Sequence, residues 1–177
     1  MDTVTKPPKA STPAVSPPEY LITVSMADLQ VCNDDAAVLT AYALGSCIGV
    51  AAWDPTNRIG GMMHVMLPSS QAGGSSGWAR PAMFADTAVP LLVGRLIQLG
   101  CAKEHLVVKI AGGGQLLAES KQLAIGSRNV TAVRAAFAAQ QIEIAGEDVG
   151  GTKSRSLKMH LGTGRVVVCS VGEETDI

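Results

Sequence analysis

Short apolar runs alternate with turn-forming residues along most of the chain. Eight runs predict β-strands, at 20–26, 38–44, 48–53, 59–66, 106–111, 142–145, 156–161 and 165–171. Asp, Asn, Gly and Pro separate these runs, and the segments 53–57 and 162–164 are typical of tight turns between strands. We therefore expect the first four strands to form hairpins.

Apolar residues at helical spacing predict a first helix that ends at residue 99. Asp86 is expected to cap its N-terminus, because a carboxylate there accepts hydrogen bonds from backbone N–H groups that lack a partner within the helix. Pro90 then falls in the first turn, where it removes no intrahelical hydrogen bond. Gly100 follows the last apolar position and is expected to end the helix.

A second helix is predicted from about residue 128 to 140, with Ser127 or Asn129 as its N-cap. Its apolar residues recur at the spacing that places them on one buried face. Many strands with two helices indicate a mixed fold, of the α/β or α+β class.

The composition of the chain changes near residue 19. Residues 1–18 hold five prolines among Ser, Thr and Lys, and we expect a disordered tail there because such a segment cannot bury enough apolar surface. Residues 19–172 are expected to form one domain, and 173–177 a short C-terminal tail. The stretch 69–77, rich in Gly and Ser, is expected to be a mobile surface loop.

Composition and charge exclude several classes of protein. Apolar residues make up 47% of the chain and charged residues 16%, which indicates a compact globular protein rather than a disordered one. With 14 Lys and Arg against 15 Asp and Glu, the net charge is −1, so we expect no nucleic-acid partner. No apolar stretch approaches the ~18 residues of a membrane span, and residues 1–10 lack the pattern of a secretory signal. We expect a cytoplasmic protein without membrane insertion.

The candidate chemistry centres on Cys47 and His64. The four cysteines form no CxxC pair, so no metal site is expected. Cys47 follows a Gly-Ser turn and directly precedes the predicted strand 48–53. His64 lies in the predicted strand 59–66, so a hairpin would bring the imidazole to the thiol. Such a pair is typical of a cysteine nucleophile with its base, because an imidazolium partner lowers the pKa of a thiol. The alternative is a buried cysteine and a core histidine on adjacent strands.

The turn before Cys47 is expected to take part in substrate binding. Gly45 is expected to have a positive φ, because it has no Cβ. This conformation would let a substrate approach the backbone N–H groups of Gly45 and Ser46, which could then stabilise a developing oxyanion.

Several short strings in fixed order carry a resemblance to a known family. They are 44–47 (Leu-Gly-Ser-Cys), 53–55 (Trp-Asp-Pro), 61–68 (Gly-Met-Met-His-Val-Met-Leu-Pro), 85–88 (Ala-Asp-Thr-Ala), 109–113 (Lys-Ile-Ala-Gly-Gly), 125–130 (Ile-Gly-Ser-Arg-Asn-Val) and 147–151 (Glu-Asp-Val-Gly-Gly). Together they extend over about residues 20–171, and their order and spacing resemble the CheD family of chemotaxis proteins.

The resemblance implies a cytoplasmic protein-glutamine glutaminase that converts selected glutamines of methyl-accepting chemoreceptors to glutamate and releases ammonia. By similarity, Cys47 is the nucleophile, which forms a thioester, and His64 is the base; no metal or cofactor takes part. The implied fold has three layers, with a β-sandwich core and two main helices. The implied partners are the receptors and a CheC-type phosphatase.

One departure from the family pattern concerns the residue that orients the histidine. In the family, this residue is a threonine six positions before the cysteine, where this chain has Ala41. Its neighbour Thr40 could take the role only if a bulge or a register shift intervenes, because successive side chains of a strand point to opposite faces. A backbone carbonyl or another hydroxyl is the alternative.

The departure also keeps other functions open. A weak or inactive regulator could bind receptors or the CheC phosphatase without turnover. A third interpretation is a cysteine hydrolase with another substrate.

Overall fold

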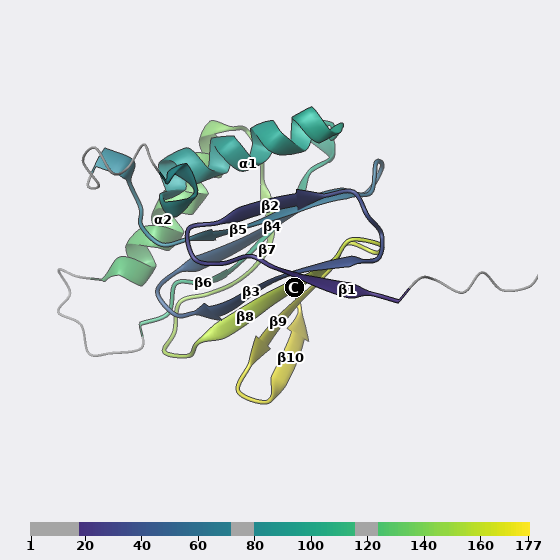
Figure 1. The fold of residues 1–177 in the computed structure, drawn as a ribbon. Helices are drawn as coiled ribbons and strands as arrows, with labels where there is room; N and C mark the ends of the chain where they lie inside the picture. Colours follow the sequence, from purple (N-terminus) through teal and green to yellow (C-terminus); the bar gives the residue numbers. More distant parts are fainter. Residues whose placement is uncertain (1–17, 72–79, 116–123) are drawn as a thin grey trace, which may run out of the picture.

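Two five-stranded sheets pack face to face, and two helices cover the outer face of one of them (Figure 1). This arrangement is seen in a computed structural model that describes residues 18–71, 80–115 and 124–177. It confirms the expected α+β fold with three layers and two main helices.

The sheet without helices has the strand order β1-β3-β8-β9-β10. Its strands are β1 (Tyr20–Thr23), β3 (Ala37–Leu44), β8 (Arg155–His160), β9 (Arg165–Ser170) and β10 (Glu173–Asp176). β1 runs parallel to β3, and the other neighbours are antiparallel.

The helix-covered sheet has the strand order β2-β5-β4-β6-β7. Its strands are β2 (Leu29–Cys32), β5 (Ile59–Val65), β4 (Ile48–Asp54), β6 (Val107–Gly112) and β7 (Ile144–Val149). Only β6 and β7 are parallel. The short 3-10 helices η2 (Pro81–Met83) and η3 (Lys103–His105) flank α1 (Ala85–Leu99), and α2 (Ile125–Ala139) joins β6 to β7.

Strand alternation assigns each face of the helix-covered sheet to a different core. In β5, Met63 and Val65 pack against the helices, whereas Met62 packs between the two sheets. His64 follows Met62 by two residues and therefore also faces the space between the sheets. We call that space the sandwich core.

The first helix begins and ends close to its predicted bounds, but two details of the prediction were wrong. Asp86 lies in the first turn of α1 rather than at the N-cap, which is Phe84. Pro90 is the sixth residue of the helix, so it lies in the second turn, and the helix accommodates it. Gly100 ends the helix with φ 113°, as predicted.

The second helix begins three residues before its predicted start. Ile125 is its first residue, so both expected caps, Ser127 and Asn129, lie inside the helix. Their side chains instead bond to backbone carbonyls, because Ser and Asn can satisfy their donors in this way within a helix.

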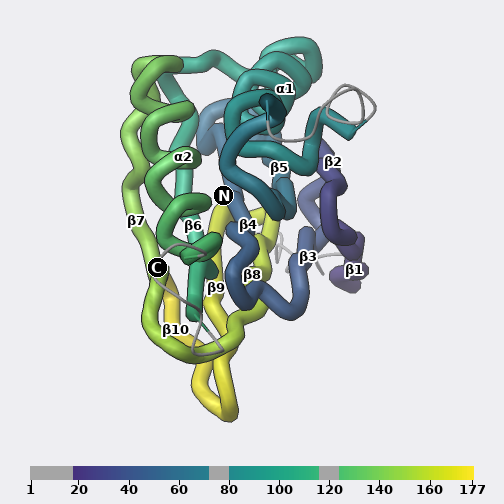
Figure 2. Tube along the Cα trace, turned by 90° about the vertical axis from the view of Figure 1, so that its left-hand side faces the viewer, coloured from purple at the N-terminus to yellow at the C-terminus, as the bar shows by residue number. Residues whose placement is uncertain are grey.

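Strands β2 and β10 were not predicted. Residues 173–176, expected as part of a tail, pair with β9, and the following Ile177 donates its N–H to the Val166 carbonyl (3.1 Å). The chain therefore ends beside β7 of the other sheet (Figure 2). Residues 1–17 of the expected N-terminal tail (1–18) and residues 72–77 of the expected loop (69–77) lie outside the described residues.

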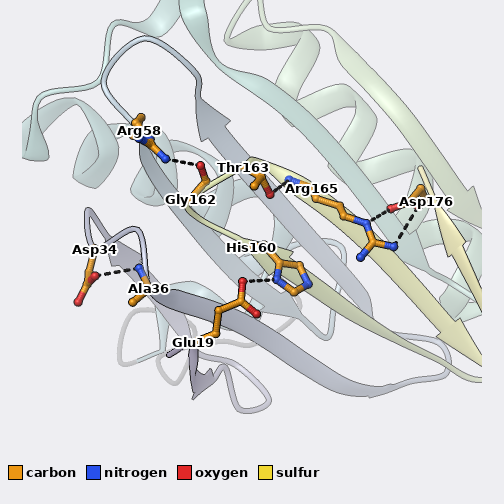
Figure 3. A network of polar contacts seen from close by, with 9 residues as sticks. All are labelled: Glu19, Asp34, Ala36, Arg58, His160, Gly162, Thr163, Arg165 and Asp176. Carbon is orange, nitrogen blue, oxygen red and sulfur yellow. Dashed lines mark hydrogen bonds and ion pairs between the residues drawn. The ribbon is translucent and has the colours of Figure 1, made fainter. Parts of the chain in front are cut away.

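Polar contacts fix both described ends of the chain to the same sheet (Figure 3). Glu19, just before β1, accepts a contact from the His160 Nδ1 of β8 at 2.9 Å. Arg165 of β9 binds both carboxylate oxygens of Asp176 in β10, at 2.8 and 3.1 Å. Among the described residues, neither helix is long and apolar enough to cross a membrane.

Candidate active site

The loop that carries Cys47 crosses from one sheet to the other. β3 ends at Leu44 in one sheet and β4 begins at Ile48 in the other, so residues 45–47 connect the two layers. The expected hairpin between these two strands was therefore wrong. The hairpin that matters is β4–β5, which is antiparallel through the predicted turn at 53–57.

The β4–β5 register places Cys47 and His64 at the same end of the sandwich core. Gly49 is the direct partner of His64 and Ile48 that of Val65, so Cys47 stands one step beyond the last pair. Cys47 packs against the sandwich core, as His64 does by alternation. Residues at such diagonal positions on one face of a sheet are neighbours about 7–8 Å apart. No hydrogen bond joins the Cys47 thiol to the His64 ring in the described structure.

Burial favours the uncharged form of both groups. The Cys47 thiol is half-buried, and loss of solvation raises its pKa above the ordinary 9.0. Burial likewise lowers the pKa of His64 below 6.5, and the Val24 backbone acts weakly in the opposite direction. Both shifts favour an uncharged thiol and an uncharged imidazole, opposite in sense to the shifts expected for a thiolate–imidazolium pair.

The imidazole of His64 is enclosed and has no hydrogen-bonding partner in the described part of the chain. Only 2% of the residue is exposed, and neither ring nitrogen meets hydrogen-bond geometry with a described group. The segment 24–28 runs beside the His64 backbone and joins the two sheets. The Val24 N–H donates to the Thr40 carbonyl of one sheet (2.8 Å), and the Ala27 N–H donates to the His64 carbonyl of the other (3.0 Å).

Thr40 and Ala41 lie on opposite faces of β3. Leu39 and Ala41 pack in the sandwich core, and the register of β3 is regular up to Ala41, since its irregularity falls between Ala41 and Leu44. Thr40 therefore points to the outer face of its sheet, away from His64, and its buried hydroxyl has no partner among the described residues. The bulge that Thr40 would need lies after it, not beside it.

The left-handed residue before Cys47 is Ala43, not Gly45. Ala43 has φ 56°, and Gly45 is absent from the residues with positive φ. The Gly45 N–H donates to the Ala43 carbonyl (2.9 Å) and so is already used within the turn. In the described chain, the N–H groups of Ser46 and Cys47 donate to no protein group.

Three donors hold the carbonyls of residues 45–47. The Gly114 N–H binds the Gly45 carbonyl (2.7 Å), and the Gly113 N–H binds the Cys47 carbonyl (2.8 Å). The Ser46 carbonyl accepts a hydrogen bond from Asn129 Nδ2 at 2.9 Å. The neighbouring Gly112, φ 115°, must be glycine, since a Cβ there would lie 2.2 Å from the Cys47 carbonyl oxygen.

Asn129 is a functional candidate that its sequence position did not reveal. It is fully buried in α2, and its Nδ2 also donates to the Met66 carbonyl just beyond β5 (2.8 Å). The sequence signal was a polar residue next to Val130 on the buried face of a helix. It was missed because Asn129 was interpreted as an N-cap.

The other cysteines and acidic residues form no comparable site. All four cysteines are free, and burial raises the pKa of Cys101 to about 11. Within the described ranges, no group of three or more His, Cys, Asp or Glu could hold a metal ion.

Comparison with known proteins identifies similar chains. A family model described as CheD chemotactic sensory transduction matches residues 66–170. A "Probable chemoreceptor glutamine deamidase CheD 2" from Anaeromyxobacter dehalogenans is 44% identical over 150 residues, which cover 85% of this chain and 94% of the relative. A "Probable chemoreceptor glutamine deamidase CheD" from Symbiobacterium thermophilum is 44% identical over 152 residues, which cover 84% and 92%.

Proposed function

The chain belongs to the CheD family, and from this membership we propose that it hydrolyses glutamine side chains of methyl-accepting chemoreceptors to glutamate and ammonia. The names of its relatives support the reaction and the substrate. In this proposal Cys47 is the nucleophile and His64 the base.

The first half of the reaction forms a thioester. His64, uncharged at neutral pH, takes the proton of the Cys47 thiol as the sulfur adds to the glutamine carboxamide carbon. The carbonyl oxygen becomes an oxyanion. When the C–N bond breaks, the imidazolium returns its proton to the departing nitrogen, and ammonia leaves.

The second half restores the enzyme. His64 removes a proton from water, which adds to the thioester carbon, and the C–S bond then breaks to release glutamate. The imidazolium protonates the leaving sulfur. Glutamine and water are consumed, glutamate and ammonia are formed, and Cys47 and His64 end in their starting states.

The observation that carries this proposal is the placement of Cys47 and His64 on one face at the end of the β4–β5 ladder. The raised pKa of the thiol makes the neutral imidazole the reactive form of the base, since the proton must be transferred during attack. The Val24 carbonyl is the candidate orienting group, because it raises the His64 pKa and the Val24 N–H is used by Thr40. It does not meet hydrogen-bond geometry with the ring in this structure, so the imidazole must turn toward it during the reaction.

The test uses a purified receptor cytoplasmic fragment and mass spectrometry of its peptides. Wild type should convert glutamine to glutamate, and Cys47→Ala and His64→Ala should not. Cys32→Ala, which removes another half-buried free thiol, is the matched control and should remain active. Unchanged conversion by Cys47→Ala would refute the mechanism.

The second candidate function is a regulator that binds receptors without turnover. Ala41 favours it, since the chain lacks the hydroxyl that the family places near its histidine. Receptor binding without amide conversion by wild type would support this function. Docking of a CheC-type phosphatase stays a prediction.

A further inference from the structure

We infer that Asn129 is a positioning residue that aims the backbone N–H of Cys47 at the oxyanion of the reaction. The inference rests on the proposed deamidation and adds a residue outside the Cys47–His64 pair. It follows from the way the carbonyl groups of the loop are held.

The first step is the geometry of a peptide plane. In a trans peptide, the C=O of one residue and the N–H of the next are fixed in one plane and point in opposite directions. The Ser46 carbonyl and the Cys47 N–H belong to the same plane. A donor that binds the Ser46 carbonyl therefore determines where the Cys47 N–H points.

The second step is the identity of that donor. Asn129 Nδ2 binds the Ser46 carbonyl at 2.9 Å, and Gly114 holds the preceding plane through the Gly45 carbonyl at 2.7 Å. The carbonyls of these two planes are thus held by α2 and by the segment after β6. Their N–H groups, those of Ser46 and Cys47, face away and donate to no protein group in the described chain.

The third step is the link from this donor to the strand of the base. The same Nδ2 group donates to the Met66 carbonyl at 2.8 Å, two residues after His64. Both acceptors are carbonyl oxygens, which cannot bond to each other. The Asn129 amide has two N–H donors and can therefore bind both carbonyls at once. Asn129 therefore fixes the orientation of the nucleophile loop relative to the strand that carries His64.

The fourth step concerns what else Asn129 could do. Its Oδ1 is buried and has no partner within the described residues, so the side chain is held by its donors alone. A buried polar atom without a partner costs free energy, so the two hydrogen bonds that Asn129 donates must outweigh this cost. This cost is expected where the constraint serves the reaction.

An N–H group at the nucleophile is the donor type that stabilises tetrahedral intermediates of acyl transfer. Its loss commonly lowers kcat by about 10²–10³-fold. Removal of Asn129 frees the Ser46–Cys47 peptide to rotate, and the Cys47 N–H would no longer face the reacting oxygen.

The experiment compares two reactions of the same thiol. Alkylation of Cys47 by iodoacetamide displaces iodide and forms no oxyanion. Binding of a receptor peptide with glutamate γ-semialdehyde in place of glutamine forms a hemithioacetal, whose oxygen lies where the oxyanion develops. Its affinity is read as protection of Cys47 from iodoacetamide.

For Asn129→Ala we expect kcat of deamidation to fall about 100-fold with little change in KM, and the aldehyde affinity to fall by a similar factor. The alkylation rate should stay within about twofold of wild type, because the thiol pKa is set by burial. Asn129→Ser, which keeps one donor, should lie between wild type and Asn129→Ala. It also provides the test if the alanine variant does not fold.

The matched control is Val133→Ala, which removes a fully buried side chain from the next turn of α2 without touching either carbonyl. It should lose stability and keep kcat. The inference is overturned if a folded Asn129 variant keeps kcat and aldehyde affinity, or loses alkylation rate in parallel with them. Absence of deamidation by wild type would instead refute the proposed function, since the aldehyde measurement does not depend on turnover.

Discussion

Gly49 and His64 lie directly opposite each other in the ladder between β4 and β5. Because glycine has no side chain, leucine side chains of the other sheet occupy the space over Gly49, next to His64. The nearest atoms to a Cβ on Gly49 would be Leu44 Cδ1 at 2.7 Å and Leu157 Cδ2 at 3.2 Å. The sandwich core therefore closes against the backbone at the position next to His64.

Gly49→Ala should destabilise the protein and slow the reaction. The added methyl displaces Leu44, which ends the strand before the nucleophile loop, and overpacking of this kind costs about 1–3 kcal/mol. A small shift of residues 45–47 should lower kcat by about tenfold or more. Urea unfolding and the deamidation rate measure the two effects.

The control is a glycine with free space around it. A Cβ on Gly94 of α1 would meet no atom within 4 Å, so Gly94→Ala should raise the free energy of unfolding by about 0.5–1 kcal/mol and leave kcat unchanged. Equal behaviour of the two variants would contradict the packing described for Gly49.

The pH dependence should follow the uncharged imidazole. The lowered pKa of His64 places the acid limb of kcat/KM below pH 6.5, and the raised pKa of Cys47 places the midpoint of its alkylation above pH 9.0. Iodoacetamide labelling of each cysteine across pH, read by peptide mass, measures the second value. A Cys47 midpoint well below 9.0 would show instead a thiolate held by an imidazolium.

The same shift of His64 predicts a change of stability with pH. The unfolded chain binds a proton at its ordinary pKa near 6.5, whereas the folded state resists protonation. The contribution of His64 to the free energy of unfolding is therefore fully present above pH 6.5, and it is lost as the pH falls from 6.5 toward the lowered pKa of the folded state. His64→Gln should flatten this part of the unfolding free energy measured from pH 7 downward.

Ala41→Thr should restore an orienting hydroxyl. Ala41 is fully buried and faces the same sandwich core as His64, whose ring nitrogens lack partners in the described chain. We expect a gain in kcat of roughly tenfold or more, since loss of an orienting group in a related triad costs about 10⁴-fold. Ala41→Val has the same shape without the hydroxyl and should give no gain. Equal rates for the two would show that no hydroxyl is needed at this position.

Asp54 should be among the most sensitive residues for stability. Its buried carboxylate accepts hydrogen bonds from the N–H groups of Thr56 (2.8 Å) and Ala102 (3.0 Å) and from Asn57 Nδ2 (2.9 Å). Asp54→Ala leaves these donors without partners and should cost about 2–4 kcal/mol in urea unfolding. Asp35→Ala removes a half-exposed ion pair with Arg58 and should change stability by less than about 0.5 kcal/mol.

Acid should act on the same carboxylate. Burial raises the pKa of Asp54, but its hydrogen bonds outweigh burial and lower the pKa below 3.8. The stability it contributes is present above that pH and is lost as pH falls through the lowered pKa. Thermal unfolding of wild type and Asp54→Ala should therefore converge in strong acid.

Strands were predictable where apolar residues alternate over many positions, and less so where short strands lie at the edges of the sheets. The strands around Cys47 and His64 carry enough apolar residues for alternation to show. β2 and β10 have four residues each and pair along one side only, so their sequences carry little apolar signal. The assignment of β3 and β4 to different sheets depends on long-range pairing that local sequence does not encode.

The site was predictable as residue types but not as geometry. Cys47 and His64 followed from their strands and from the family resemblance. The left-handed conformation of Ala43 could not be expected, because alanine usually avoids positive φ. The role of Asn129 depends on two carbonyls contributed by distant segments, Ser46 and Met66.

The segment 24–28 is hydrogen-bonded to β3 on one side and to β5 on the other. These hydrogen bonds to both sheets exist only once the two layers have docked. During refolding, activity should return with the slow long-range pairing of the layers rather than with the fast formation of the helices. Recovery of deamidation should therefore follow the docking of the two sheets, which activity and circular dichroism recorded in parallel would measure.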